Sequence, residues 1–282
     1  MSSDAAFVMI GVKVRRSAGA GDRPFVTLAR DREGTWDPSD SSAANDGPSF
    51  IIRRDKCWEP MVSAVVYACV SACVDICTQE NIGQHASFID CYAHIGWFGA
   101  LAAEAGASKI VLVESNETYR RISTKNMEFA AFAGDLAFSD TTWAAVESTD
   151  HRSLLTIRLR GVHFDRSMLT FMTIASIEQL SALIVDLYAA DAMLENIVEF
   201  VVASLSVFSV FHLGCPESSI VPASPAAVMR PIDDGNARRA LAEAAGGSGV
   251  VLLFVRKGPH TAAIMSSVVS VVRSLYVRTH EY

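Results

Sequence analysis

The sequence lacks the short motifs that assign a function class at once. It contains no His-Glu-x-x-His, no phosphate-binding Gly-x-x-x-x-Gly-Lys-[Ser/Thr] loop and no Gly-x-Ser-x-Gly turn, so metalloprotease, nucleoside-triphosphatase and serine-hydrolase functions have no support. No Gly-x-Gly-x-x-Gly follows a predicted strand, which disfavours a dinucleotide oxidoreductase. Cysteines never occur as Cys-x-x-Cys, so the zinc-ribbon spacing is absent.

Long uncharged apolar runs are missing as well. Residues 60–74 and 200–215 carry no Asp, Glu, Lys or Arg, but both runs are shorter than the about 18 residues that a spanning helix needs. The second run is better interpreted as a helix end followed by a buried strand. We therefore expect no membrane span. Because Asp4 precedes any apolar run, we expect an intracellular protein, cytoplasmic by default, with an organelle left open.

Basic residues are fewer than acidic residues. The chain has 24 Lys and Arg against 31 Asp and Glu, a formal net charge of −7, which argues against a protein that binds nucleic acid by neutralising phosphates. Charged residues make up 20% and hydrophobic residues 50% of the 282 positions. That much apolar surface can offset chain entropy, so the composition excludes disorder as the main state.

The six cysteines favour a reducing compartment. Cys69, Cys73 and Cys77 follow one another at intervals of four and share one face of a predicted helix. Three thiolates could hold a soft metal, but cysteines in this pattern are more often small buried hydrophobic residues. We expect no metal site.

Strands and helices alternate along most of the chain. We expect an N-terminal extension over residues 1–49, with a strand at 6–14 and a polar linker at 31–49, and one domain over 50–282. Predicted helices cover 58–79, 95–105, 116–132, 189–204, 236–245 and 260–274. Strand signals occur at 87–91, 109–114, 134–138, 142–147, 153–160, 168–174, 183–187, 207–213 and 249–255. Short, nearly all-apolar strands between helices predict a doubly wound, mostly parallel α/β sheet with helices on both faces.

Two predicted strands end in an acid. Asp90 closes the first strand, Glu114 closes the second, and Gly96 lies in the turn between the first strand and its helix. In open α/β sheets, ligands bind at the carboxyl ends of the strands. A loop that enters a helix can receive a polar ligand group, and a carboxylate after the second strand can accept hydrogen bonds from a ribose diol. These residues predict a nucleoside-cofactor site.

The residues around these acids resemble the FkbM-type family of S-adenosylmethionine-dependent methyltransferases. Residues 88–98 are similar to the family's strand, Asp-x-Gly-Ala-Asn-Ile-Gly and helix, and residues 112–116 to its strand ending in Glu-Pro-Asn. Trp58-Glu59-Pro60 resembles the family's approach helix, and 183–197 is a weaker match to Lys-Ile-Asp-Val-Glu-Gly-Ala-Glu. The matching positions, within a resemblance that covers residues 50–257, are Asp90, Ala93, Ile95, Gly96, Glu114, Asn116, Asn126, Asp186 and Ala190, with Asp191 as a conservative replacement.

The resemblance implies the methyltransferase fold, with its seven-stranded type of sheet, and S-adenosylmethionine as the cofactor. It places the cofactor-binding residues at Asp90, Tyr92, Ala93, Gly96, Glu114 and Asn116. His94, with a side-chain pKa that is ordinarily near neutrality, and Asp186 are the weak candidates for a catalytic role, as general base and as a group that orients a substrate hydroxyl. Asp90 could equally order the loop, and Gly96 could serve packing alone.

Departures from the family's pattern keep a second interpretation open. Tyr92 stands where the family has a glycine that lets the cofactor approach, so its ring either stacks on a ligand or fills the pocket. The other departures are His94, Ser115, Ile184, Tyr188 and Ala189, of which Ile184 and Tyr188 remove two polar groups that could serve a substrate site.

Two hypotheses follow. The first is an enzyme that methylates an oxygen of a small-molecule, glycan or lipid-like acceptor. The second is a catalytically inactive methyltransferase-like subunit that is kept for its surface and bound to protein partners in an assembly. For the second, the apolar segment 260–277 is a candidate interface helix.

Overall fold

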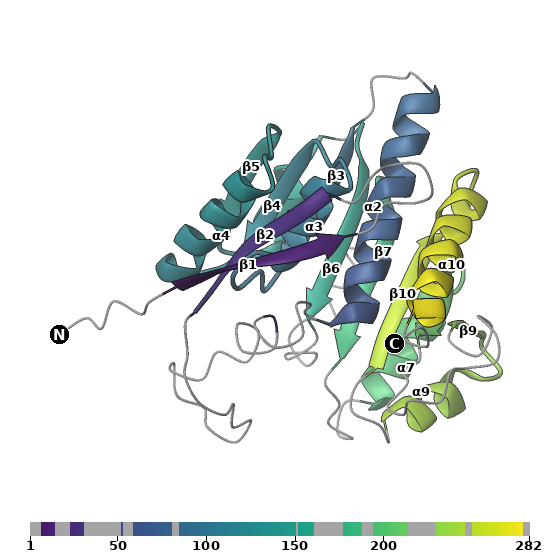
Figure 1. Cartoon of the computed structure of the whole chain (residues 1–282). Coiled ribbons are helices and arrows are strands. Elements are labelled where there is room, and N and C mark those ends of the chain that lie inside the picture. Colours follow the sequence, from purple (N-terminus) through teal and green to yellow (C-terminus); the bar gives the residue numbers. More distant parts are fainter. Residues whose placement is uncertain are drawn as a thin grey trace.

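Eight strands form one sheet in the computed structural model of the chain, which describes residues 7–14, 23–30, 52, 59–80, 85–150, 152–160, 177–187, 194–213, 229–245 and 250–278 (Figure 1). The spatial order of the strands is β5-β4-β3-β6-β7-β10-β8-β9. Along the chain they are β3 (Ala86–Cys91), β4 (Lys109–Val113), β5 (Asp135–Ser139), β6 (Leu154–Arg160), β7 (Leu180–Leu187), β8 (Phe208–Leu213), β9 (Met229–Ile232) and β10 (Val250–Arg256).

The strand order places a topological switch point between β3 and β6. From β3 the chain moves outward through β4 to β5, and it then continues on the other side of β3 with β6 and β7. These five strands pair in parallel, whereas β10 is antiparallel to both β7 and β8, and β8 is antiparallel to β9. Because ligands of open α/β sheets bind beside the switch point, the carboxyl ends of β3 and β6 are the expected place for a site.

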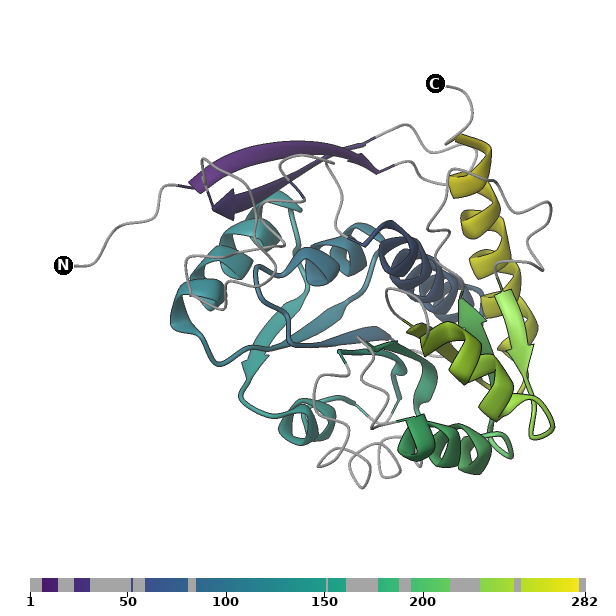
Figure 2. The same cartoon turned by 90° about the horizontal axis from the view of Figure 1, so that it is seen from below.

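Helices cover both faces of the sheet. They are α2 (Pro60–Glu80), α3 (Trp97–Glu104), α4 (Glu117–Phe129), α5 (Thr142–Glu147), α7 (Leu194–Ser204), α9 (Ala237–Ala245) and α10 (Thr261–Arg278). The first core packs α2, α3, α4 and α10 against one face, and the second packs α5, α7 and α9 against the other (Figure 2). Neighbouring strand residues such as Phe88 and Ile89 enter different cores, as expected for a sheet without a wet face. The predicted doubly wound, mostly parallel α/β fold is confirmed, and its sheet is of the seven-stranded type that the resemblance implies, with β9 added at one edge.

Helix α2 is long and apolar enough to cross a membrane over Met61–Glu80, but 67% of its most apolar window is buried inside the protein. The helix packs on β3, β6, β7, α3 and α10, and Ser267 of α10 donates a hydrogen bond of 3.1 Å to the carbonyl oxygen of Ala68. Its cysteines Cys69 and Cys73 are buried, and burial raises the pKa of Cys73 to about 12. A place in the core therefore accounts for the apolar character of α2 and for its neutral thiols.

Most predicted elements agree with the structure, and one is wrong. Residues 142–147, predicted as a strand, form helix α5, because the hydroxyl oxygen of Thr141 accepts a hydrogen bond of 3.2 Å from the backbone N–H of Ala144 and begins a helical turn. Strand β9 and the antiparallel direction of β10 were not predicted. The predicted linker at 31–49 and the strand signal at 168–174 lie outside the described residues.

The N-terminal strand has a partner that the sequence did not reveal. Strand β1 (Phe7–Val14) pairs antiparallel with β2 (Arg23–Arg30), and the pair forms a separate two-stranded sheet. Strand β2 contacts helix α4, so the hairpin lies on the outer side of the helices that cover this face of the main sheet (Figure 2). The domain boundary at residues 49/50 stays a prediction.

The last helix buries part of its apolar surface inside the protein, and its role as an interface helix stays a prediction. In α10, Ile264, Val268 and Val272 are buried in the first core, and the helix packs beside α2. As far as Val272, its apolar face is therefore turned into the protein.

Candidate functional site

The loop between β3 and α3 has an unusual backbone. Tyr92, His94 and Gly96 all have positive φ angles, of 67°, 50° and 74°. The backbone N–H groups of Tyr92 and Ala93 donate to the carbonyl oxygen of Val113, at 3.1 and 3.2 Å. The loop is thereby fixed to the end of β4. Tyrosine and histidine adopt this left-handed region only at a cost in free energy, so the surrounding contacts must hold the loop in place.

Helix α4 holds the loop from the other side. The hydroxyl of Ser123 donates to the carbonyl oxygen of His94 at 2.9 Å, and the amide of Asn126 donates to the carbonyl oxygen of Ile95 at 2.7 Å. A Cβ at Gly96 would lie 2.8 Å from the Cβ of Ser123, so space and backbone angle both require glycine there. The packing role predicted for Gly96 is therefore present, against α4.

The carboxylate of Glu114 lies beside the same loop. One oxygen accepts the backbone N–H of His94 at 2.9 Å, and the other accepts the backbone N–H of Asn116 at 2.8 Å. Asn116, where the helix predicted over 116–132 begins, is the N-cap of α4, because its side-chain oxygen accepts from Thr118 at 2.9 Å and from Tyr119 at 3.3 Å. The imidazole of His94 packs on the ring of Tyr119, with 3.9 Å between ring centroids.

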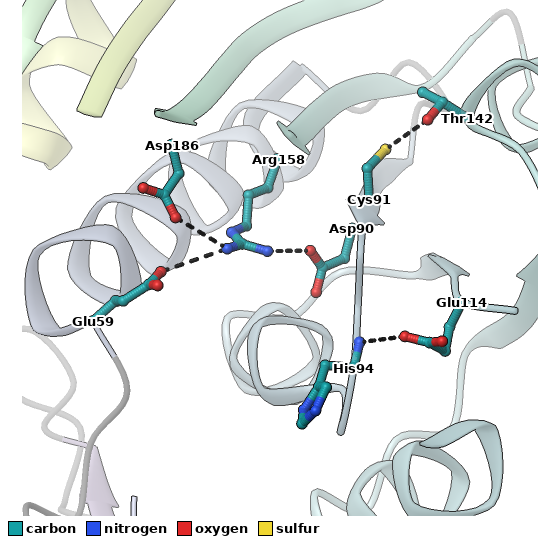
Figure 3. A network of polar contacts seen from close by, with 8 residues as sticks. All are labelled: Glu59, Asp90, Cys91, His94, Glu114, Thr142, Arg158 and Asp186. Carbon is teal, nitrogen blue, oxygen red and sulfur yellow. Dashed lines mark hydrogen bonds and ion pairs between the residues drawn. The ribbon is translucent and has the colours of Figure 1, made fainter. Parts of the chain in front are cut away.

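A buried cluster of four charged side chains surrounds the end of β3. The guanidinium of Arg158, at the carboxyl end of β6, lies 3.0 Å from Asp90, 3.3 Å from Asp186 and 3.5 Å from Glu59 (Figure 3). Asp90 is 0% and Arg158 2% exposed, and Arg158 also lies over the ring of Phe98, 3.9 Å from its centroid. The four residues come from the start of α2 and from three adjacent strands, so the fold alone brings them together.

Burial controls the ionisation of this cluster. It raises the pKa of Asp90 to about 6, against the lowering effect of Arg158. Burial and the charge of Glu59 raise the pKa of Asp186 to about 7, again against Arg158. Burial lowers the pKa of Arg158, but the three carboxylates raise it above its ordinary value overall. The neighbouring thiol of Cys91, 3.3 Å from the hydroxyl of Thr142, has a pKa raised by burial to about 12 and is therefore neutral.

A hollow opens at the switch point between the loop and β6. Its volume is about 270 Å³, which includes open solvent, and its walls are residues 92–95, Trp97, Phe98, Arg158 and Arg160. The side chain of Tyr92 is 49% exposed at this wall. Four predicted site residues therefore meet here or in the loop that forms the wall: Tyr92, Ala93, His94 and Gly96. Ala190, Asp191, Tyr188 and Ala189 lie outside the described residues.

Sequence reasoning missed Arg158 and Glu59 as members of the site. The signal for Arg158 was an arginine between two apolar residues, Ile157 and Leu159, near the carboxyl end of β6, since a charge in a buried strand needs a partner. Glu59 was noticed only as part of Trp58-Glu59-Pro60. Among the residues that the structure describes, no group of three His, Cys, Asp or Glu side chains is arranged to hold a metal ion.

Comparisons with known proteins find likeness in structure only. No protein-family model and no curated protein matches the sequence. A SAM-dependent methyltransferase from Agrobacterium tumefaciens is similar over 82% of this chain and 67% of its own, with 11% identity and a TM-score of 0.49. An rRNA methylase from Streptococcus thermophilus is similar over 67% of this chain and 93% of its own, with 8% identity and a TM-score of 0.43. Similarities this distant do not identify an activity or an acceptor.

Proposed function

We propose that this chain binds S-adenosylmethionine at the hollow beside the β3–α3 loop and acts as a methyltransferase. The observation that carries the proposal is the position of the two strand-end acids. Asp90 and Glu114 stand at the ends of adjacent parallel strands, next to the topological switch point, and the loop between β3 and α3 links them. This is where an α/β sheet of this order binds a nucleoside cofactor.

The residues present fit such a cofactor. A carboxylate offers about four lone-pair positions, and the two N–H groups on Glu114 take two of them. Glu114 therefore keeps an acceptor position on each oxygen for a ribose diol. Asp90 has one buried oxygen, Oδ2, without a hydrogen-bond partner among the described residues, and that oxygen can receive a donor of the ligand.

When bound, S-adenosylmethionine supplies a methyl group on a positively charged sulfur. The protein's part in such a transfer is to align the acceptor and to take its proton where the acceptor is a hydroxyl. Asp186 suits the second task, because a pKa of about 7 lets a carboxylate accept a proton near neutral pH. The backbone N–H of His94 is bound by Glu114 and its ring packs on Tyr119, which favours a structural role for this residue.

The acceptor that the resemblance favours is an oxygen of a small molecule, a glycan or a lipid-like molecule. The deficit of basic residues argues against a nucleic-acid acceptor that is bound through its phosphates. The choice among the three classes is a proposal that rests on the resemblance alone.

Titration with S-adenosylmethionine and with its demethylated product tests the proposal, by calorimetry and thermal unfolding. Ligand at about 100 times its dissociation constant should add roughly 2.7 kcal/mol to the free energy of unfolding. Replacing Glu114 with Ala should abolish binding, whereas the matched change Glu117→Ala, at an exposed acid on α4, should preserve it. Absence of heat and of any thermal shift at millimolar ligand would refute the proposal.

A second candidate function, a catalytically inactive subunit of a larger assembly, is favoured by the size of the hollow. The space that the hollow encloses has room for about one water molecule, far less than the roughly 300–1,000 Å³ of ordinary ligand pockets. A chain that binds neither ligand and co-purifies with a stable protein partner would support this alternative. A monodisperse monomer without partners would count against it.

A further inference from the structure

Two carboxyl groups of the buried cluster are in contact with each other. Asp186, at the carboxyl end of β7, forms a side-chain hydrogen bond with Glu59, which directly precedes α2. Both acids also contact the same nitrogen of Arg158, Nη2, at 3.3 and 3.5 Å. An ionised carboxylate only accepts hydrogen bonds, so a bond between two carboxyl groups requires a proton on one of them. The contact therefore implies one proton within the pair.

The charges around the pair call for the same proton. Glu59, Asp90 and Asp186 face two cations of β6, because Arg160 lies opposite Asp186 in the register of β6 and β7, two residues beyond Arg158. Fully ionised, these groups carry three negative charges against two positive ones, a net charge of −1. Burial penalises a charge without compensation, and one carboxyl proton makes the group of five neutral.

The other elements that pack on β7 add no charge beside the pair. Strand β10 places Val251 opposite Asp186, and its one charged residue, Arg256, lies at the far end of the strand. Helix α2 has its acids, Asp75 and Glu80, in its last two turns, and the raised pKa values of its thiols keep them neutral. Charge effects on Asp186 therefore come from the cluster itself and from Arg160.

The backbone fixes Glu59 in this position. Its φ angle of 44° lies in the left-handed region, which a residue with a side chain adopts only at a cost in free energy. Its carbonyl oxygen accepts the backbone N–H of Ser63 at 2.8 Å, and the hydroxyl of Ser63 accepts the indole N–H of Trp97 at 2.9 Å. The start of α2 and the side-chain contacts of Glu59 therefore hold this residue beside Asp186 together.

We propose that Glu59 and Asp186 share one proton, and that Glu59 is thereby the positioning residue that keeps Asp186 able to take a proton from the methyl acceptor. The inference rests on the proposed function, because it names the residue that tunes the proton acceptor described there. Two acids that share a proton titrate as a pair, since each charge disfavours the other. Without the carboxyl group of Glu59, the pKa of Asp186 falls from its raised value, and a carboxylate of lower pKa is a weaker base.

NMR titration of the side-chain carboxyl carbons tests the proposal in the intact chain. In the wild type, the signal of Asp186 should shift with a midpoint near pH 7, and that of Glu59 should shift in the same range, because both report the loss of one proton. Glu59→Gln should lower the Asp186 midpoint by at least about one pH unit, a tenfold loss in proton affinity. Glu117→Gln, at an exposed acid of α4, is the matched control and should leave that midpoint unchanged.

The same measurement from the other residue guards against a variant that fails to fold. In Asp186→Asn the signal of Glu59 should no longer shift near pH 7, because its partner in the shared proton is gone. If neither variant folds, the wild type alone decides, since both signals must shift in the same range. A purely structural contact between the two side chains would leave both midpoints independent.

The outcomes separate this proposal from the proposed function. If the Glu59 signal stays constant while Asp186 titrates, or if Glu59→Gln leaves the Asp186 midpoint unchanged, no proton is shared and the proposal is wrong. Calorimetric binding of S-adenosylmethionine then decides on the proposed function by itself. If the pair titrates as expected but the donor does not bind, the shared proton stands and its role in a methyl transfer falls together with the proposed function.

Discussion

Asp90 and Glu114 are acids at the ends of adjacent strands, and the protein stabilises their carboxylates by different interactions. Asp90 is fully buried, and its partner is the charge of Arg158. Glu114 is only half-buried, and its partners are two backbone N–H groups of the loops beside it. The first acid therefore ties β3 to β6, β7 and the start of α2, whereas the second ties the β3–α3 loop to the start of α4.

This difference indicates that charge interactions hold the part of the site around Asp90, whereas hydrogen bonds and loop geometry hold the part around Glu114. The Asp90 side should respond to pH and to the removal of charge, because burial magnifies both effects. The Glu114 side should respond to the loss of hydrogen-bond acceptors and to strain in the loop. The experiments below change one side at a time.

Removal of Arg158 should have the largest effect on stability. Arg158→Met leaves three acids without their cation, and breaking a buried ion pair in this way costs about 3–5 kcal/mol in the free energy of unfolding. Urea unfolding at pH 7 measures the loss, with Arg121→Met as an exposed control that should stay within about 0.5 kcal/mol of the wild type. A loss below about 1 kcal/mol for Arg158→Met would show that the cluster does not depend on its cation.

The pH dependence of stability should be the next largest effect. The pKa of Asp186 is raised to about 7 in the folded protein, above its value in the unfolded chain, so ionisation of this group costs free energy. Its destabilising contribution is absent below the unfolded pKa of about 4, grows as the pH rises from there to about 7, and is constant above that pH. The free energy of unfolding of the wild type, relative to that of Asp186→Asn, should fall by on the order of 2 kcal/mol between pH 5 and pH 8.

Unfolding of both proteins by urea at pH 5, 6, 7 and 8 gives this difference directly. Acids far from the cluster that titrate in the same range contribute equally to both proteins, so their contributions cancel in the comparison. A difference that is constant with pH, or that grows in favour of the wild type as the pH rises, would contradict the raised pKa.

At Glu114, the change Glu114→Gln should lower the free energy of unfolding by about 1–2 kcal/mol. One carboxylate oxygen becomes an NH₂ group and faces a backbone N–H, so one of the two bonds to His94 and Asn116 is lost and a donor is left without an acceptor. Hydrogen exchange should show faster exchange at the amide of His94 or Asn116, with little change around Arg158. Glu117→Gln, at an exposed acid of the same helix end, is the control and should leave these amides unchanged.

The sequence predicted more of the Glu114 side than of the Asp90 side. The strand ends and the start of α4 at Asn116 depend on residues close together in the chain, and the structure has both, whereas the fit of Gly96 against Ser123 depends on the packing of α4. The acid cluster joins Glu59, Asp90, Arg158 and Asp186, which only the order of β3, β6 and β7 brings together. The error at 142–147 has a different, local cause, since apolar content favoured a strand and the capping bond of Thr141 was overlooked.

Replacement of Tyr92 should have the smallest and most local effect on stability. Its φ of 67° costs a residue with a side chain roughly 1–2 kcal/mol, and only glycine avoids this cost. Tyr92→Ala keeps the strain and Tyr92→Gly removes it, but glycine also gains freedom in the unfolded chain, by about 0.5–1 kcal/mol. We therefore expect Tyr92→Gly to be more stable than Tyr92→Ala by about 0.5–1 kcal/mol in urea unfolding.

Comparison of glycine with alanine isolates the backbone, because both variants remove the ring from the wall of the hollow. Equal stability would show that the contacts with Val113 and α4 do not force the left-handed conformation, and the loop would then be free to move when a ligand enters. Greater stability of the glycine variant would show that these contacts hold residue 92 in the left-handed conformation and keep the loop rigid.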